Sequence, residues 1–323
     1  MAFASRNLKL NVNVTDINPN ALSRMKNIIY PKRYGAWDSK ISLLNYNDLK
    51  YLKKNFDLII IGTPPKNHLD LFNFCLKTIK FKNILIEKPL SVYSQKNITK
   101  LKNLDNLYCG YNHSISKSVN YFLSQILKFK KNINYIDVNW KEGWSGILNA
   151  HFWMKNEFQS YLGNIEEGGG SLHEHSHGLH LLLVIFEVLK INLKSLSQSQ
   201  NIFFRYKGEK KYDEFTQIFF TNKKIFAKYE TDLKTYPAKK EISVSGKNFC
   251  LKWICNHNNN SDKVIVNNNG KIKEKIFYKT RSSEFENEIN HILFYNKKSK
   301  KNLNINFAIE TMKIINKTMK HEK

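Results

Sequence analysis

Two short apolar runs in the first hundred residues each end in a turn that contains proline. Residues 58–61 are followed by Gly62-Thr63-Pro64-Pro65, and residues 83–86 are followed by Glu87-Lys88-Pro89. Short β-branched runs closed in this way are typical of buried parallel strands, whose sheets are covered on both faces. Open sheets of this class bind ligands at the carboxyl ends of their strands, so Lys88 is expected to project into a site.

The first 112 residues alternate strands and helices, whereas the later residues are mostly strands. We expect strands at residues 10–16, 58–61, 83–86 and 107–111, and helices at residues 21–29, 46–54, 68–79 and 94–101. After a helix at residues 115–129, strands follow at residues 133–140, 202–206, 216–220, 225–230, 241–245 and 263–266, before a last helix at residues 308–319. The pattern predicts an α/β fold with two domains. Residues 1–112 would form a doubly wound parallel sheet, and residues 113–323 a second α/β domain with a mostly antiparallel sheet, whose last helix packs back on the first domain.

Charge and composition limit the classes of partner. The 52 basic and 27 acidic residues give a net charge of +25, but the lysines are spread along all 323 residues. A nucleic-acid surface needs its charges on one face, so no nucleic-acid partner is expected. Four irregularly spaced cysteines argue against a disulfide framework. No run is long and apolar enough for a membrane span, so we expect a cytoplasmic protein with no membrane partner.

A second dense segment begins with three glycines, Gly168-Gly169-Gly170. It continues as Ser171-Leu172-His173-Glu174-His175-Ser176-His177-Gly178-Leu179-His180. Ser171 is expected to cap a helix that carries Glu174, His177, His173 and His180 on one face. The motif His173-Glu174-x-x-His177 matches a zinc metallopeptidase pattern. However, that helix normally continues upstream of the first histidine, where this chain has glycines, so we expect no metal and keep the peptidase as a third alternative.

Taken together, these motifs resemble the glucose-fructose oxidoreductase and inositol dehydrogenase family (Gfo/Idh/MocA). The family has a Glu-Lys-Pro motif at a Rossmann strand end, and later a three-glycine segment leading to an acidic residue and, three residues on, a histidine. The matching residues, in order, are Gly62-Thr63-Pro64-Pro65-Lys66-Asn67-His68, Glu87-Lys88-Pro89, Gly110-Tyr111-Asn112, Gly168-Gly169-Gly170, Glu174 and His177. The resemblance implies a Rossmann-type first domain and an NAD(P)-dependent oxidoreductase that acts on a secondary hydroxyl or keto group of a sugar, cyclitol or nucleotide sugar.

Roles for single residues follow from this resemblance and from the chemistry. Oxidising a carbinol needs a base for the hydroxyl proton and a cation near the oxygen. His177 would be the base, Lys88 would bind the oxygen, and Glu174 would orient the substrate or Lys88. The cofactor would contact Asp16, Gly62, Thr63, Pro64, Pro65, His68, Glu87 and Lys88, and the substrate would contact Asn112 and His180. Asp16 ends a strand and no arginine follows it directly, so NAD is favoured over NADP. A homo-oligomer is also implied.

The chain departs from the family at its start. The family begins with a strand and a Gly-x-Gly-x-x-Gly turn that holds the pyrophosphate, and no such turn precedes Asp16. Residues 1–10 resemble the end of the helix that should follow this turn, so the first strand and the glycine-rich turn are expected to be missing. The start given can lie downstream of the true one, the gene can be a decaying fragment, or redox chemistry can have been lost while binding was kept. The last account makes a catalytically silent sugar-binding or interaction protein the second functional hypothesis.

Overall fold

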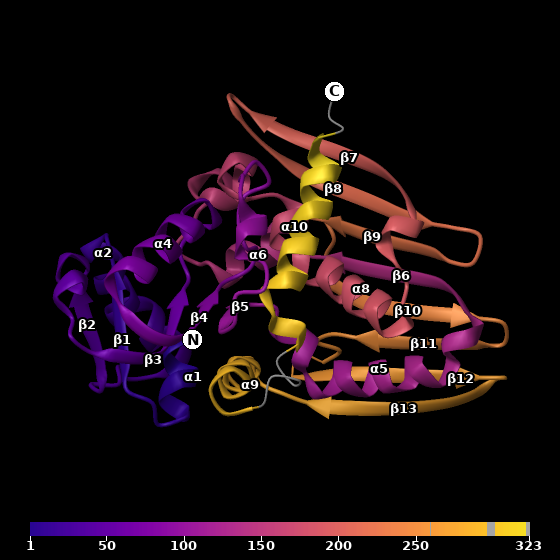
Figure 1. The fold of residues 1–323 in the computed structure, drawn as a ribbon, viewed down its shortest axis with the longest axis horizontal. Helices are drawn as coiled ribbons and strands as arrows, with labels where there is room; N and C mark the ends of the chain where they lie inside the picture. The colour runs from indigo at the N-terminus through magenta and orange to yellow at the C-terminus, as the bar shows by residue number, and fades with distance from the viewer. Residues whose placement is uncertain (259, 296–300, 321–323) are drawn as a thin grey trace.

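The strands form two groups on opposite sides of the molecule (Figure 1). The structure is a computed structural model that describes residues 1–258, 260–295 and 301–320. The first group consists of five short strands and includes all those expected at the start of the chain. These strands are β1 (Val12–Asp16), β2 (Ile41–Asn45), β3 (Asn55–Ile61), β4 (Lys80–Ile86) and β5 (Leu107–Cys109). The helices of this part are α1 (Ala2–Asn7), α2 (Pro19–Arg24), which continues through the π-helical turn Met25–Ile29 into α3 (Tyr30–Tyr34), and α4 (His68–Thr78).

All pairs within the first group are parallel, as the alternating pattern predicts. β1 pairs with β2, and β3, β4 and β5 form a separate three-stranded sheet. Within the described residues, no strand joins β1 to β3. β3 and β4 end side by side, because Ile61 is in register with Ile86 and the Glu87 amide donates to the Ile61 carbonyl at 2.9 Å. The two turns singled out in the sequence therefore lie next to each other.

The second group is one eight-stranded sheet. Its order is β13-β12-β11-β10-β6-β9-β8-β7, and every pair is antiparallel except the parallel pair of β6 and β9. The strands are β6 (Ile133–Lys141), β7 (Ser197–Lys207), β8 (Lys210–Thr221), β9 (Phe226–Asp232), β10 (Lys239–Gly246), β11 (Phe249–Ile254), β12 (Ser261–Asn268) and β13 (Lys271–Tyr278). The helices of this part are α5 (Lys117–Phe129), α6 (Trp144–Ala150), α7 (Ser171–Glu174), α8 (Ser176–Leu189), α9 (Arg281–Phe294) and α10 (Ile305–Lys320).

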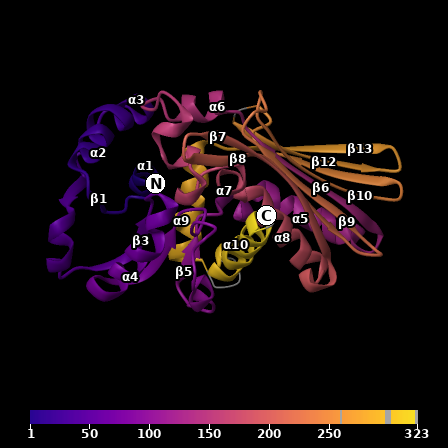
Figure 2. The same ribbon diagram turned by 90° about the horizontal axis from the view of Figure 1, so that it is seen from above.

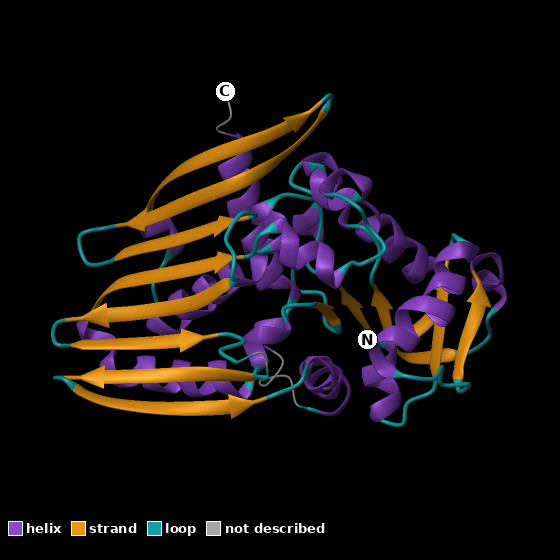
Figure 3. Cartoon of the chain, turned by 180° about the vertical axis from the view of Figure 1, so that it is seen from behind, coloured by secondary structure: helices purple, strands orange, loops and turns teal. Residues whose placement is uncertain are grey.

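One face of the large sheet carries the helices that contain the core. Figure 2 shows α5, α8 and α10 on the same side of the sheet, and Figure 3 shows that most of the opposite face has no helix over it. α8 is apolar on every side, and residues 178–186 are all buried because the helix lies between the sheet and α10. α10 also contacts β5, so it joins the second part of the chain to the first. Among the described helices, none combines the length and the apolar character that crossing a membrane requires.

The structure corrects several expected elements. Strands β2, β11 and β13 and helix α9 were not predicted, and the helices expected at residues 46–54 and 94–101 are only the short 3-10 turns Tyr46–Tyr51 and Ile98–Leu101. β13 was missed because it is an edge strand whose alternating lysines and glutamate are largely exposed. The helix expected at residues 94–101 fails because Asn97 adopts a left-handed conformation, with φ at 67°.

A buried aspartate on β8 fixes the three-glycine segment ahead of α7. Asp213 Oδ2 accepts hydrogen bonds from Ser171 Oγ at 2.6 Å, the Leu172 amide at 2.8 Å and Thr216 Oγ1 at 3.0 Å. Gly170 has a φ of 91°, and a Cβ there would lie 1.9 Å from Asp213 Oδ1, so only glycine fits. Ser171 is thus the first residue of the helix rather than its cap, and Asp213 determines where α7 begins.

Asp213 should make the stability of the protein depend on pH. Burial raises the pKa of this carboxyl to about 6, against the weaker opposing effect of its hydrogen-bond donors. The native state therefore keeps a proton that the unfolded chain releases near pH 4. The stabilisation is complete below that pH and is lost as the pH rises through 6. Relative to Asp213→Asn, the wild-type free energy of unfolding should fall by about 2–3 kcal/mol between pH 4 and pH 7. Urea unfolding measures it, and Asp57→Asn, at an exposed carboxyl, is the control that should show no such change.

Candidate functional site

Lys88 joins the end of β4 to the end of α7. Its Nζ donates to the Glu174 backbone carbonyl at 2.6 Å and lies 3.2 Å from Glu174 Oε2. Both side chains are largely buried, with exposed fractions of 17% and 23%. Burial acts to raise the pKa of Glu174, but Lys88, followed by His175, outweighs it, and the pKa is lowered. Glu174 is therefore a carboxylate at neutral pH, and it holds the Lys88 ammonium in place.

His177 lies in the first turn of α8, among aromatic rings. It makes edge-to-face contacts with Tyr111 and His113, with ring centroids 5.5 and 4.7 Å away, and its ring is 6.0 Å from that of Trp140. Burial lowers its pKa well below the usual value, and the positive charges of His113 and Lys88 add to this. His177 is therefore neutral at pH 7. Its Nδ1 is buried and has no hydrogen-bond partner among the described residues.

The histidine-rich segment is two short helices and not the single helix that the sequence predicted. The chain bends at His175, with φ at −98° and ψ at 17°, so α7 ends before α8 begins. His173 therefore does not share a helix face with His177; its Nδ1 lies 3.0 Å from the Gly169 carbonyl. The two histidines of the zinc pattern contact different neighbours, and the described residues contain no group of three or more side chains placed to hold a metal.

The two residues expected to contact the substrate are placed differently. His180 lies in the core: its ring stacks on Tyr111 at 3.9 Å, its Nε2 is 2.9 Å from the Asn302 carbonyl, and its Nδ1 is 3.4 Å from Thr311 Oγ1. Both ring nitrogens are thus engaged, and the structure does not bring His180 to a ligand. Asn112, in contrast, has a buried Oδ1 with no partner among the described residues. It directly precedes His113, which touches His177.

The turn after β3 is tied to the turn after β4 by His68. This buried ring, at the start of α4, has Nε2 at 2.7 Å from the Thr63 carbonyl and Nδ1 at 3.0 Å from the Pro89 carbonyl. His68 therefore holds the two turns together and has no nitrogen left for a cofactor. Thr63 Oγ1, however, is buried without a partner among the described residues.

The other expected residues of these turns pack closely around the strand ends. Gly62 lies beside Glu87, and a Cβ on it would be 3.9 Å from Glu87 Cγ. Pro65 follows Pro64 and contacts Gly168, where a Cβ would lie 2.6 Å from the proline ring. The turn after β3 therefore touches the three-glycine segment. Glu87 is half-buried, and the loss of solvent around its carboxyl raises its pKa.

The residues present fit the two ends of a dinucleotide better than the pyrophosphate in its middle. A nicotinamide carries an amide that needs hydrogen-bond partners, and the unpaired Thr63 Oγ1 lies at the carboxyl ends of the strands, near Lys88. At the far end, Asp16 closes β1, and its Oδ1 accepts from the Asn18 amide at 2.8 Å, which fixes the carboxylate. No glycine occurs before Gly35, so these residues contain no glycine-rich turn for a pyrophosphate.

Two neighbours of the site were not predicted as functional. His113 was not predicted because the family motif matches only the three residues before it, Gly110-Tyr111-Asn112. Glu284, whose Oε1 lies 3.3 Å from His113 Nδ1, comes from α9, a helix that the sequence did not reveal. The one signal that could have found His113 is its position three residues after Gly110, at the crossover between the domains.

Residues 11–110 match the model of the oxidoreductase family with an NAD-binding Rossmann fold, Gfo/Idh/MocA. No curated protein matches the sequence.

Several solved structures share the fold at low sequence identity. The chain is similar to aldose-aldose oxidoreductase from Caulobacter crescentus complexed with glycerol, with a TM-score of 0.69 and 10% identity over 96% of this chain and 88% of that chain. It is similar to levoglucosan dehydrogenase in complex with NADH and levoglucosan, with a TM-score of 0.67 and 12% identity over 96% and 88%. It is also similar to a 3-ketoreductase from Actinomadura kijaniata in complex with NADP and TDP-benzene, with a TM-score of 0.65 and 11% identity over 92% and 86%. The match to the Gfo/Idh/MocA model thus covers the first domain, and the fold of the whole chain is that of these oxidoreductase structures.

Proposed function

We propose that this protein transfers a hydride between a nicotinamide cofactor and a secondary hydroxyl or keto group of a sugar, cyclitol or nucleotide sugar. The observation that carries the proposal is the contact of Lys88 with Glu174, at the strand ends of an NAD-binding Rossmann domain. A neutral His177 follows Glu174 by three residues. The arrangement offers a cation and a base together, which is what oxidation of a carbinol requires.

The donors of Lys88 leave one place for a substrate oxygen. An ammonium has three N–H donors, and two of them point to Glu174. The third can donate to the hydroxyl of the substrate and stabilise the negative charge that develops there. His177 Nε2 would take the proton of the same hydroxyl. Its lowered pKa keeps it unprotonated at neutral pH, so it is ready to act as a base.

A bound nicotinamide would supply the hydride acceptor. We propose that Thr63 and the Pro64-Pro65 turn hold its nicotinamide end, with only a minor contact from Lys88, and that Asp16 holds the adenosine ribose, because a carboxylate accepts from ribose hydroxyls. The carboxylate would also repel a 2′-phosphate, so we propose NAD as the preferred cofactor. The similar structures contain NADH in one case and NADP in another, and so support either.

The substrate class is inferred from the site and its neighbours. The buried Asn112 Oδ1 and the ion pair of Lys240 with Glu142, at 2.6 Å, supply polar groups suited to a compound with many hydroxyls. Of this ion pair, Lys240 lowers the pKa of His175 and Glu142 raises it, so both lie close to this residue. His175 stands between Glu174 and His177 in the chain. The names of the similar structures include an aldose and levoglucosan as substrates. We also propose a homo-oligomer, for which the uncovered face of the large sheet is available (Figure 3).

Cofactor binding and turnover test the function in two steps. NADH fluorescence titration should show saturable binding, and a panel of sugars, cyclitols and nucleotide sugars should include one that produces NADH from NAD. Sugar binding by calorimetry without any turnover would favour the catalytically silent binding protein. If neither NADH nor NADPH binds, the proposed oxidoreductase activity is wrong.

Replacing Lys88 should reduce turnover far more than cofactor binding. Lys88→Ala removes the donor to the substrate oxygen, so kcat should fall about 100-fold or more, whereas the Kd for NADH should change by less than about threefold. Steady-state kinetics and fluorescence titration measure the two quantities. Lys82→Ala, at an exposed lysine in β4, the strand that ends just before Lys88, is the control and should keep wild-type values. An unchanged kcat in Lys88→Ala would exclude this role.

Replacing Asp16 should reduce the preference of the protein for NADH over NADPH. Asp16→Ala removes the acceptor for the ribose hydroxyls, so NADH should bind about tenfold more weakly. NADPH binding should not weaken, because the repulsion of its 2′-phosphate is also lost. The ratio of the two Kd values is the readout, and an unchanged ratio would mean that Asp16 does not contact the ribose.

A further inference from the structure

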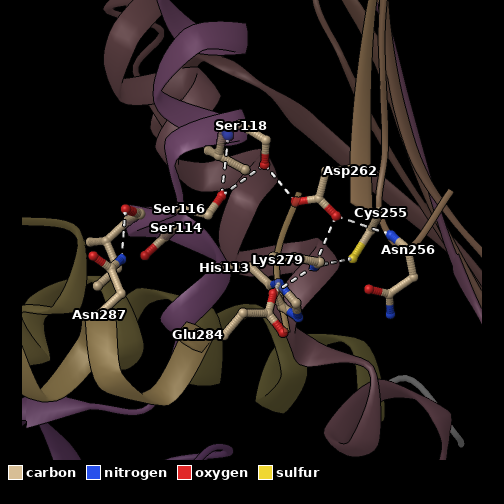
Figure 4. A network of polar contacts seen from close by, with 12 residues as sticks. His113, Ser114, Ser116, Ser118, Cys255, Asn256, Asp262, Lys279, Glu284 and Asn287 are labelled. Atoms are coloured by element: carbon tan, nitrogen blue, oxygen red, sulfur yellow. Dashed lines mark hydrogen bonds and ion pairs between the residues drawn. The ribbon is translucent and has the colours of Figure 1, made fainter. Parts of the chain in front are cut away.

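A polar network behind the reacting centre ends at His113, which touches His177. Lys279 Nζ lies 2.6 Å from Glu284 Oε1 and 2.8 Å from Asp262 Oδ1, and Glu284 Oε1 lies 3.3 Å from His113 Nδ1 (Figure 4). The His113 ring then meets the His177 ring edge to face, at 4.7 Å between centroids. A continuous line of contacts therefore leads from α9 and β12 to the candidate base.

The network is anchored where the second domain is rigid. Asp262 is 1% exposed; its Oδ2 accepts from Ser118 Oγ at 2.6 Å and its Oδ1 from the Asn256 amide at 3.0 Å. Ser118 Oγ in turn accepts from Trp253 Nε1 at 3.0 Å. These groups belong to α5, β11 and β12, which form part of the core. Lys279 and Glu284 therefore have little freedom to move, and neither has the ring that they hold.

The charges of the network are not balanced by its own members. Asp262 and Glu284 bring two carboxylates, and Lys279 brings one ammonium. One negative charge is left over, and His113 Nδ1 lies beside the carboxylate of Glu284. Burial acts to raise the pKa of Glu284, but His113 and Lys279 outweigh it and lower the pKa to about 2. Glu284 is thus ionised over the working range of an enzyme, and its carboxylate lies within ion-pair distance of the His113 ring.

We propose that His113, held by Glu284, is a positioning residue for His177: it fixes the orientation of the His177 ring and, when protonated, opposes the binding of a proton there. His113 contacts Trp140 as well, at 5.3 Å between ring centroids, so it fills the space behind His177. His177 has no carboxylate partner of its own on Nδ1, and the ring of His113 supplies the fixed contact instead. The role in catalysis rests on the proposed function, whereas the effect on His177 does not.

The other groups that influence His177 are accounted for. They are Tyr111 ahead of α5, Lys88 after β4, Trp140 in β6, Lys240 in β10 and His180 in α8. Burial is the largest cause of the lowered pKa of His177, and His113 is the first of the charged neighbours, ahead of Lys88. A change at His113 should therefore be visible above the effects of the remaining groups.

An NMR titration tests the proposal without cofactor or substrate. The full chain is labelled at its histidines, and the His177 ring signal is assigned by its loss in His177→Gln. In His113→Gln, which keeps an N–H for Glu284 but carries no charge, the pKa of His177 should rise by about one unit. Asn287→Ala is the matched control: Asn287 also joins α9 to the turn before α5, donating to the Ile115 carbonyl at 3.2 Å, and its loss should leave His177 unchanged. An unchanged pKa of His177 in His113→Gln would overturn the proposal.

Glu284→Gln gives a second and independent variant. Without its carboxylate contact, the His113 ring is held less firmly against His177, so its effect there weakens and the pKa of His177 should rise, but by less than in His113→Gln. A fall would mean that Glu284 acts on His177 directly, and would contradict the role given to His113. Failure of both variants to fold would show that the pair is purely structural and would also overturn the proposal.

Kinetics connect the pair to catalysis. In His113→Gln the acid limb of the kcat profile should move to higher pH with the pKa of His177, and kcat should fall about tenfold while KM for the sugar stays within about threefold. A change confined to KM would place His113 in substrate binding instead. If the wild-type protein shows no turnover, the proposed function fails, and the NMR titration still decides the role of His113.

Discussion

The site depends on one contact between distant parts of the chain, in which Lys88 donates to Glu174. The lysine comes from the first sheet and the glutamate from the short helix that precedes α8, so the contact exists only when both domains are folded and docked. Both groups are mostly removed from water, and removing either would leave a buried charge without its partner. The contact therefore sets the distance between the strand ends and His177.

The two domains are not held together by one continuous sheet. β1 and β2 form their own pair, and side chains take the place of strand pairing. Phe3 of α1 stacks on Tyr34 at 4.1 Å, and Arg6 Nε lies 2.8 Å from Asp38, so α1 holds the β1–β2 layer. α1 packs in turn on α9, the helix that carries Glu284. The first layer of the Rossmann domain is thus joined to the second domain through helices rather than through a central strand.

The sequence predicted the strand ends of this site but not its internal geometry. Lys88 and the turn at Gly62 follow apolar runs whose period and endings determine a parallel strand, so their placement was predictable. The bend at His175 was not, because every residue from Ser171 to His180 except Gly178 is compatible with one helix. The start of α7 depends on Asp213, 42 residues after Ser171, which also could not be inferred from the local sequence. His113 and Glu284 were missed for the same reason: their meeting depends on how α9 packs.

The histidines around Glu174 differ in what their rings can still do. His173 has one ring nitrogen beside a carbonyl and His180 has both engaged, and burial lowers the pKa of these rings to about 4 and about 3, so they serve the core as neutral aromatic groups. His177 is only half-buried; burial lowers its pKa as well, but its Nδ1 has no hydrogen-bond partner among the described residues. A buried, neutral imidazole without a partner is costly unless a ligand or a proton uses it. His173 Nε2 and His175 Nε2 are also buried without a partner among the described residues, so what separates His177 is its partial exposure together with its contact with His113 and its place near Lys88.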